Sequence, residues 1–277
     1  MDRILLALLV AASVSAAAPS PKRGVCAKNL SAEDFAALAP GVSWWYDWYF
    51  EPDAVAPAGG PRFVPMLWGD SPDLWRGATG AIEARPPVML ALNEPNLKGQ
   101  AFLAPAAAAK AWLRLDKLAR RRGVSLVGPQ MAIGSAPADS ITARDPIQRK
   151  DVTYTFMVPY LDAFRAALPR GTKLTLAIHP YGNVGELKWA VGEIVKRYGG
   201  PVWVTEFNDW KAADEDASMA YMKEAVAFME ASPDVAGYAW FMARLKDQPA
   251  RSLLAAEPGK LTRLGRLYVE LPAAARP

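Results

Sequence analysis

Two glutamates stand where apolar, β-rich runs of the sequence end. Glu94 follows Val-Met-Leu-Ala-Leu-Asn at residues 88–93, and Glu206 follows Pro-Val-Trp-Val-Thr at residues 201–205. A buried strand gains nothing from a carboxylate, so two strands that each end in one indicate a site. Two carboxyl groups about 5 to 5.5 Å apart are what a retaining glycosidase needs, one as acid/base and one as nucleophile. This chemistry is our first hypothesis for the pair.

The alternation along both runs predicts where the two glutamates point. Apolar residues at 88, 90 and 92 share parity with Glu94, and those at 202 and 204 share parity with Glu206. Side chains on one face of a strand recur at every second residue, so we expect both rows to face the same interior. Trp203 has the opposite parity, and we expect it to pack beneath a helix.

The elements that position these residues alternate between strand and helix. Eight β-rich runs occur, at residues 22–26, 42–48, 62–68, 88–93, 125–130, 173–179, 201–206 and 235–241. Helical periodicity covers residues 105–122, 186–198, 213–231 and 261–269. This alternation predicts an α/β fold, a single (β/α)8 TIM-type barrel, in which the strand ends carrying the glutamates form the active face.

Two segments depart from the strand–helix repeat. Residues 51–61 are rich in proline and glycine, so the helix after the second strand is expected to be missing. Residues 134–151 show no periodicity and are expected to form a long loop after the fifth strand. No linker-like break divides the chain, so residues 19–277 are predicted to be one catalytic domain.

The N-terminus has the pattern of a signal peptide. A short apolar run at residues 4–12 is followed by small residues, which predicts a cleaved leader at 1–18 and a secreted or periplasmic protein. Cys26 is the single cysteine, and it cannot form an intrachain disulfide. With one histidine and no glycine-rich phosphate loop, we expect no metal and no cofactor. The net charge of +4 is scattered, so no nucleic-acid partner is expected.

Aromatic and polar side chains near the strand ends are candidates for sugar binding, because an indole offers a flat surface to a sugar ring. The tryptophan candidates are Trp44, Trp48, Trp68 and Trp240, of which Trp68 and Trp240 close their strands and are preferred. His179 and Tyr181 end the sixth strand, beside Glu206, and could donate to the nucleophile or to a sugar hydroxyl. Asp209 and Trp210 are weaker candidates.

Several motifs together make the sequence resemble a known family. They are KRGV at 22–25, VSWWYDWYFEP at 42–52, FVPMLWG at 63–69, LNEPN at 92–96, GPQMA at 128–132, HPYG at 179–182, PVWVTEF at 201–207 and YAWFMAR at 238–244. In this order they resemble the endo-β-1,3-glucanases of glycoside hydrolase family 128. The resemblance implies Glu94 as acid/base, Glu206 as nucleophile, and Asn93 as a donor to the 2-hydroxyl of the sugar in the cleaved subsite.

The chain departs from the family pattern at two positions. Asp47 stands where the family usually has asparagine, and Pro180 stands where it usually has tryptophan. The predicted function is a secreted retaining glycoside hydrolase acting on β-1,3-glucan, with a polysaccharide or oligosaccharide partner, no membrane attachment after signal cleavage, and a monomeric state. Alternatives are a retaining hydrolase or transglycosylase for another polysaccharide, and a β-glucan-binding barrel without turnover.

Overall fold

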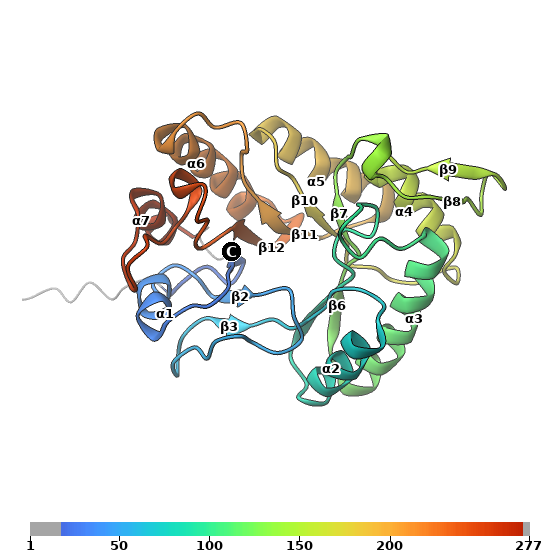
Figure 1. Ribbon diagram of the computed structural model, residues 1–277, viewed down its shortest axis with the longest axis horizontal. Coiled ribbons are helices and arrows are strands. Elements are labelled where there is room, and N and C mark those ends of the chain that lie inside the picture. The colour runs from blue at the N-terminus through green and yellow to red at the C-terminus, as the bar shows by residue number, and fades with distance from the viewer. Residues whose placement is uncertain (1–17, 274–277) are drawn as a thin grey trace, which may run out of the picture.

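A ring of parallel strands forms the centre of the protein. The computed structural model describes residues 18–273. One sheet has the order β3-β2-β1-β12-β11-β10-β7, and a second has the order β4-β5-β6. Because β4 continues β3 along the chain and β7 continues β6, the two sheets join at both ends and close a barrel (Figure 1). The bounds are β1 (Arg23–Cys26), β2 (Trp44–Tyr46), β3 (Arg62–Phe63), β4 (Met66–Leu67), β5 (Val88–Ala91), β6 (Ser125–Val127), β7 (Gln130–Ala132), β10 (Ala177–His179), β11 (Val202–Phe207) and β12 (Val235–Phe241).

This arrangement confirms the predicted α/β barrel, including all eight β-rich runs. The third and fifth runs are each divided into two strands, and both breaks contain a proline, Pro65 and Pro129. Proline has no N–H to give to a neighbouring strand, so the ladder is interrupted there. Backbone bonds across the breaks, such as that from the Leu90 N–H to the Pro65 carbonyl at 2.9 Å, keep the neighbouring strands together.

Helices follow seven of the eight barrel strands. They are α1 (Ala32–Leu38), α2 (Pro72–Glu83), α3 (Pro105–Arg122), α4 (Met157–Ala166), α5 (Val184–Tyr198), α6 (Glu215–Ala231) and α7 (Arg263–Glu270). Among the described residues no helix lies between β2 and β3, as predicted. A capping box between Asn183 and Glu186 starts α5 two residues earlier than its apolar stripe suggests. The predicted helices are confirmed, with ends shifted by up to two residues.

The segment after β7 contains more structure than a plain loop. It holds a 3-10 turn, η1 (Pro137–Asp139), and an antiparallel hairpin of β8 (Thr142–Arg144) and β9 (Asp151–Thr153). Figure 1 shows this hairpin extending away from the body. Asp145 fixes its turn, because its carboxylate accepts the N–H groups of Ile147 and Gln148 and the hydroxyl of Tyr154. The predicted loop is therefore in the right place, but the lack of periodicity concealed a short hairpin.

The inside of the barrel is filled by a separate apolar cluster. Its fully buried members all come from strands or strand ends: Cys26, Trp44, Tyr46, Val64, Met66, Leu90, Val127, Ala177 and Ala239. Trp203 packs against this cluster, 5.1 Å between ring centroids from Trp44, whereas Val202 and Val204 belong to the core that includes the helices. The expectation that Trp203 packs beneath a helix is therefore wrong. Gly237 provides room for it, since a Cβ there would lie 2.6 Å from the indole.

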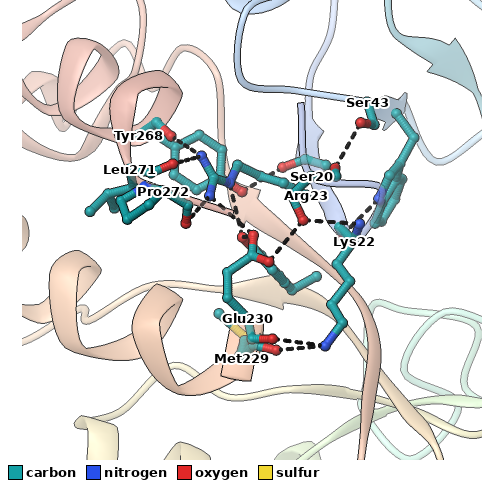
Figure 2. A network of polar contacts seen from close by, with 12 residues as sticks. Ser20, Lys22, Arg23, Ser43, Met229, Glu230, Tyr268, Leu271 and Pro272 are labelled. Atoms are coloured by element: carbon teal, nitrogen blue, oxygen red, sulfur yellow. Dashed lines mark hydrogen bonds and ion pairs between the residues drawn. The ribbon is translucent and has the colours of Figure 1, made fainter. Parts of the chain in front are cut away.

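A buried polar network connects both ends of the described chain (Figure 2). The Arg23 guanidinium pairs with Glu230 at 3.0 Å, and it donates to the carbonyls of Tyr268 and Leu271 at 2.8 Å each. The hydroxyl of Ser20 donates to the second oxygen of Glu230 at 2.9 Å. Both charged side chains are almost fully buried. Their hydrogen bonds connect the segment before β1 to the segment after α7.

Membrane crossing and export depend on different parts of the chain. Within residues 18–273, none of the helices combines the length and the apolar character needed to cross a bilayer. The predicted signal peptide at residues 1–18 lies, except for Ala18, outside the described residues.

Candidate active site

A cleft of about 840 Å³ opens at the carboxyl ends of the barrel strands. Most of the residues predicted for the site line it: Trp48, Trp68, Asn93, Glu94, Tyr181 and Glu206. Lys28, Tyr49, Trp210, Phe241 and Met242 also line it. The carboxyl ends of parallel strands converge in a barrel, so residues far apart in sequence meet here.

Glu206 is directed into the cleft by an irregularity in β11. The register with β12 shifts between Val204 and Phe207, so Thr205 and Glu206 lie in a bulge where strict alternation fails. The tyrosine hydroxyl of Tyr46 donates to Oε1 of Glu206 at 3.0 Å, and the indole N–H of Trp48 donates to the same oxygen at 2.8 Å. These contacts hold the carboxylate in one orientation.

The second oxygen of Glu206 faces the end of β10, the sixth strand of the barrel. The hydroxyl of Tyr181 donates to Oε2, and Nδ1 of His179 lies 3.5 Å from the same oxygen. Burial and the nearby charge of Glu206 raise the pKa of Tyr181 well above its ordinary value, so this hydroxyl keeps its proton and acts as a donor. Burial, followed by the charges of Cys26 and Glu206, raises the pKa of Tyr46 in the same way.

Glu94 reaches the cleft from the end of β5. Leu92 and Glu94 have positive φ values of 55° and 42°, so the strand alternation ends before the carboxylate is reached. Oε1 of Glu94 lies 2.9 Å from Nδ1 of His179, and Nε2 of His179 lies 2.9 Å from the hydroxyl of Thr205. One buried imidazole therefore connects the strand of Glu94 with the strand of Glu206.

The two carboxylates are close enough to act on one bond. One atom each of Glu94, His179 and Glu206 lies within 4.8 Å of the others. Inverting enzymes separate their carboxyl groups by about 6.5 to 9.5 Å to admit a water, whereas retaining enzymes have about 5 to 5.5 Å. The same three side chains are of the types that bind metal ions, but both nitrogens of His179 already make hydrogen bonds to protein atoms.

The charge on His179 is set by opposing effects. Burial lowers the pKa of the imidazole, but the negative charge of Glu206 and the hydrogen bond and charge of Glu94 raise it by more. The net result is a pKa above the ordinary value of 6.5. When protonated, His179 donates from Nδ1 to Glu94 and from Nε2 to Thr205.

Asn93 and Asp47 both line the cleft but have different surroundings. The amide nitrogen of Asn93 donates to Gln100 at 3.0 Å, and its buried carbonyl oxygen has no hydrogen-bond partner within the described part of the chain. One N–H of the Asn93 amide therefore remains for a ligand. The carboxylate of Asp47 accepts the backbone N–H groups of Tyr49 and Asp53, at 3.1 and 2.8 Å. It shapes the segment that replaces the missing helix.

Two predicted binding residues lie outside the cleft. Trp44 is buried inside the barrel, and its indole N–H donates to the carbonyl of Lys22. Trp240 is also buried; its indole donates to the carbonyl of Arg251 and packs against Phe207 among the helices. Both assignments are wrong. On β12 the interior row contains Ala239 and Phe241, so Phe241 and not Trp240 reaches the cleft.

The structure also brings to the site residues that the sequence patterns did not predict. Tyr46 is one of them, and its signal in the sequence is the parity that it shares with Trp44 and Trp48, which places it in the interior row. A second hollow of about 470 Å³ continues the cleft past Glu94 and Tyr181. It is lined by Phe156 and by Trp189 from α5. The position of Trp189 within the helical sequence does not distinguish it from an ordinary helical residue.

Comparisons with known proteins give matches over most of the chain. A family model described as "Glycosyl hydrolase catalytic core" matches residues 24–268. One similar solved structure is an endo-β-1,3-glucanase of glycoside hydrolase family 128, subgroup II, from Pseudomonas viridiflava. It is 36% identical, with a TM-score of 0.78, and the match covers 92% of this chain and 100% of that one. A subgroup II endo-β-1,3-glucanase from Sorangium cellulosum is 32% identical, with a TM-score of 0.77 and the same two coverages.

A third similar structure is that of an exo-acting enzyme of the same family. It is a curdlan-specific exo-β-1,3-glucanase of subgroup III from Blastomyces gilchristii, 28% identical with a TM-score of 0.70, over 90% of this chain and 97% of that one. The search of curated proteins gave no match. The family model covers most of the sequence, and two solved structures above 30% identity span their whole length in the match. The chain therefore belongs to glycoside hydrolase family 128 and is a glycoside hydrolase.

Proposed function

We propose that the protein is a retaining endo-β-1,3-glucanase with Glu94 as acid/base and Glu206 as nucleophile. The observation that carries this proposal is the approach of the two carboxylates to within 4.8 Å in a cleft that continues on both sides of Glu94. The similarity to two endo-β-1,3-glucanases supports the choice of substrate. An open cleft suits internal cleavage, because a polysaccharide can extend in both directions from the scissile bond.

In the first step, Glu206 attacks the anomeric carbon while Glu94 protonates the glycosidic oxygen. Tyr46 and Trp48 hold Oε1 of Glu206, and Tyr181 holds Oε2, so the carboxylate is oriented before substrate arrives. When His179 is protonated, its Nδ1–H donates to Oε1 of Glu94, 2.9 Å away. The proton that Glu94 delivers is then carried by its other oxygen.

In the second step, Glu94 works in the opposite direction. It takes a proton from the attacking water, whose oxygen bonds to the anomeric carbon, and the bond to Glu206 breaks. The Glu206 carboxylate regains its negative charge, which the donors from Tyr46, Trp48 and Tyr181 stabilise. Two displacements at one carbon restore the β configuration.

Substrate binding depends on groups in the larger part of the cleft. Asn93 precedes the acid and lines the cleft, and the second N–H of its amide can donate to a hydroxyl beside the reacting carbon. Trp48 and Trp68 add indole surfaces for sugar rings, and Phe241 takes the place predicted for Trp240. We also propose export by a signal peptide at residues 1–18 and a monomeric state.

The substrate is tested by incubating the protein with laminarin, curdlan, cellulose and xylan and measuring reducing ends and product sizes. Oligosaccharides of many lengths from laminarin or curdlan alone are expected. Glucose as the sole early product would instead indicate exo cleavage, and preference for cellulose or xylan would refute the substrate assignment. Binding of laminarin without any release of reducing ends would favour a non-catalytic binding protein.

A further inference from the structure

The hollow beyond Glu94 has the features of a sugar-binding site. It has a volume of about 470 Å³ and shares Glu94 and Tyr181 with the larger cleft, so the two hollows meet at the acid. Asn93 and Glu206 line only the larger part. If the sugar that becomes attached to Glu206 occupies the larger part, the leaving portion of the chain must extend into the smaller one.

An aromatic pair forms one wall of this hollow. Trp189 projects from α5 and is 46% exposed, which is unusual for tryptophan because this side chain is normally well covered. Its ring centroid lies 5.6 Å from that of Phe156, the residue that precedes α4. The pair thus offers a supported apolar surface in a hollow that also contains the acid, and sugar rings bind to such surfaces through their C–H faces.

A polar group lines the same hollow. Glu186 accepts the N–H of Asn183 in the capping box of α5, which fixes its carboxylate close to Gly182. A Cβ at Gly182 would lie 1.3 Å from that carboxylate, so a larger residue there would displace the Glu186 side chain. An oriented carboxylate next to an aromatic wall is the combination that recognises a saccharide, since it accepts hydroxyl hydrogens at the edge of the stacked ring.

We propose that Trp189 and Phe156, with Glu186 beside them, form an acceptor subsite that binds a β-1,3-linked saccharide. This inference rests on the proposed function. The subsite first holds the leaving portion of the substrate. After that portion departs, it can hold a second saccharide, which competes with water for the glycosyl-enzyme.

The transfer step uses Glu94 and Glu206 in the same roles as hydrolysis does. A hydroxyl oxygen of the bound acceptor attacks the anomeric carbon and forms the new glycosidic bond. The bond between that carbon and Glu206 breaks, and its electron pair returns to the carboxylate. The proton of the acceptor hydroxyl passes to Glu94. The subsite therefore controls the ratio of transglycosylation to hydrolysis as well as the affinity for long substrates.

The test compares Trp189→Ala with the unmodified protein on two kinds of donor. β-Laminaribiosyl fluoride has a leaving group too small to reach the aromatic pair, whereas the leaving portion of laminarihexaose can reach it. Trp189→Ala should raise KM for laminarihexaose roughly three- to tenfold, the loss expected for one aromatic contact. Its kcat/KM for the fluoride should change by much less. With the fluoride as donor and laminaribiose as acceptor, the ratio of tetrasaccharide to hydrolysed donor should fall by a similar factor.

Two further variants make the result specific. Trp189→Phe keeps an aromatic surface and should recover most of the transfer ratio. Ile147→Ala removes a side chain that is 57% exposed at the hairpin tip and lines neither hollow, so it should behave as the unmodified protein does. An unchanged transfer ratio and KM in Trp189→Ala, or an equal loss on both donors, would overturn the acceptor subsite alone. Failure of the unmodified protein to cleave either donor would refute the proposed function and the subsite with it.

Discussion

Removing the Tyr181 hydroxyl should change the rates of the two chemical steps by different factors. This hydroxyl donates to Oε2 of Glu206. In the first step Glu206 loses negative charge as it attacks, so the donor stabilises the starting carboxylate more than the transition state. In the second step Glu206 regains that charge as it leaves, so the donor favours the reaction. Tyr181→Phe should therefore slow the second step more than the first.

The expected size of the effect follows from the kind of bond that is lost. A hydrogen bond to a charged group contributes about 1.5 to 3 kcal/mol, which corresponds to a fall of roughly 10- to 150-fold in the rate of the second step. The glycosyl-enzyme then accumulates, so kcat and KM should both fall. Rapid mixing with β-laminaribiosyl fluoride should show a burst of fluoride release close to one equivalent of enzyme, followed by a slow steady state.

Tyr221→Phe is the matched control for this experiment. The Tyr221 hydroxyl is buried beside Trp240 and has no hydrogen-bond partner among residues 18–273, so its loss should leave the kinetics unchanged. A fall in kcat for Tyr181→Phe without a burst and without a lower KM would show that the hydroxyl acts mainly in the first step. That result would refute the argument from charge on Glu206.

Two other predictions concern charged groups. His179 is the single histidine of the chain, so its NMR titration can be assigned directly; its midpoint should lie above 6.5, and a midpoint at or below 6.5 would mean that burial outweighs the two glutamates. Because the folded pKa is raised, the stabilisation from His179 should be complete below about pH 6.5 and disappear as pH rises through the folded value, which thermal melts against His179→Asn will measure. Glu230→Gln should lower the free energy of unfolding by about 3 to 5 kcal/mol, because it leaves Arg23 buried without its ion pair. Denaturant titration will measure this loss, and Glu224→Gln, which breaks an exposed pair with Lys188, should have little effect.

The sequence was sufficient to predict the barrel because its signals are local and repeated. Eight β-rich runs, the helical stripes and the proline-rich segment after β2 all correspond to elements of the structure. Glu94 and Glu206 were predicted to share one site because each ends an apolar run. Their placement did not need correct side-chain parity, since strand ends converge at one face of the barrel.

The alternation of side chains along a strand predicted the wrong direction where the backbone departs from regular strand geometry. The bulge around Thr205 gives Trp203 and Glu206 the same interior direction, and the positive φ of Leu92 has the corresponding effect before Glu94. Neither feature has a glycine or proline to mark it in the sequence. On β12 a usable signal was present: small residues at Gly237 and Ala239 face an interior crowded with indoles, which places Trp240 on the opposite face.

The assignment of Glu206 as nucleophile has a direct chemical test. A 2-deoxy-2-fluoro-β-laminaribiosyl fluoride slows both steps by destabilising the oxocarbenium-like transition state, while its reactive leaving group still allows the first step. The glycosyl-enzyme should therefore accumulate. Intact-mass measurement should show the addition of one disaccharide, and peptide mapping should place it on Glu206. A label on Glu94, or no adduct together with products of inverted anomeric configuration, would contradict the mechanism.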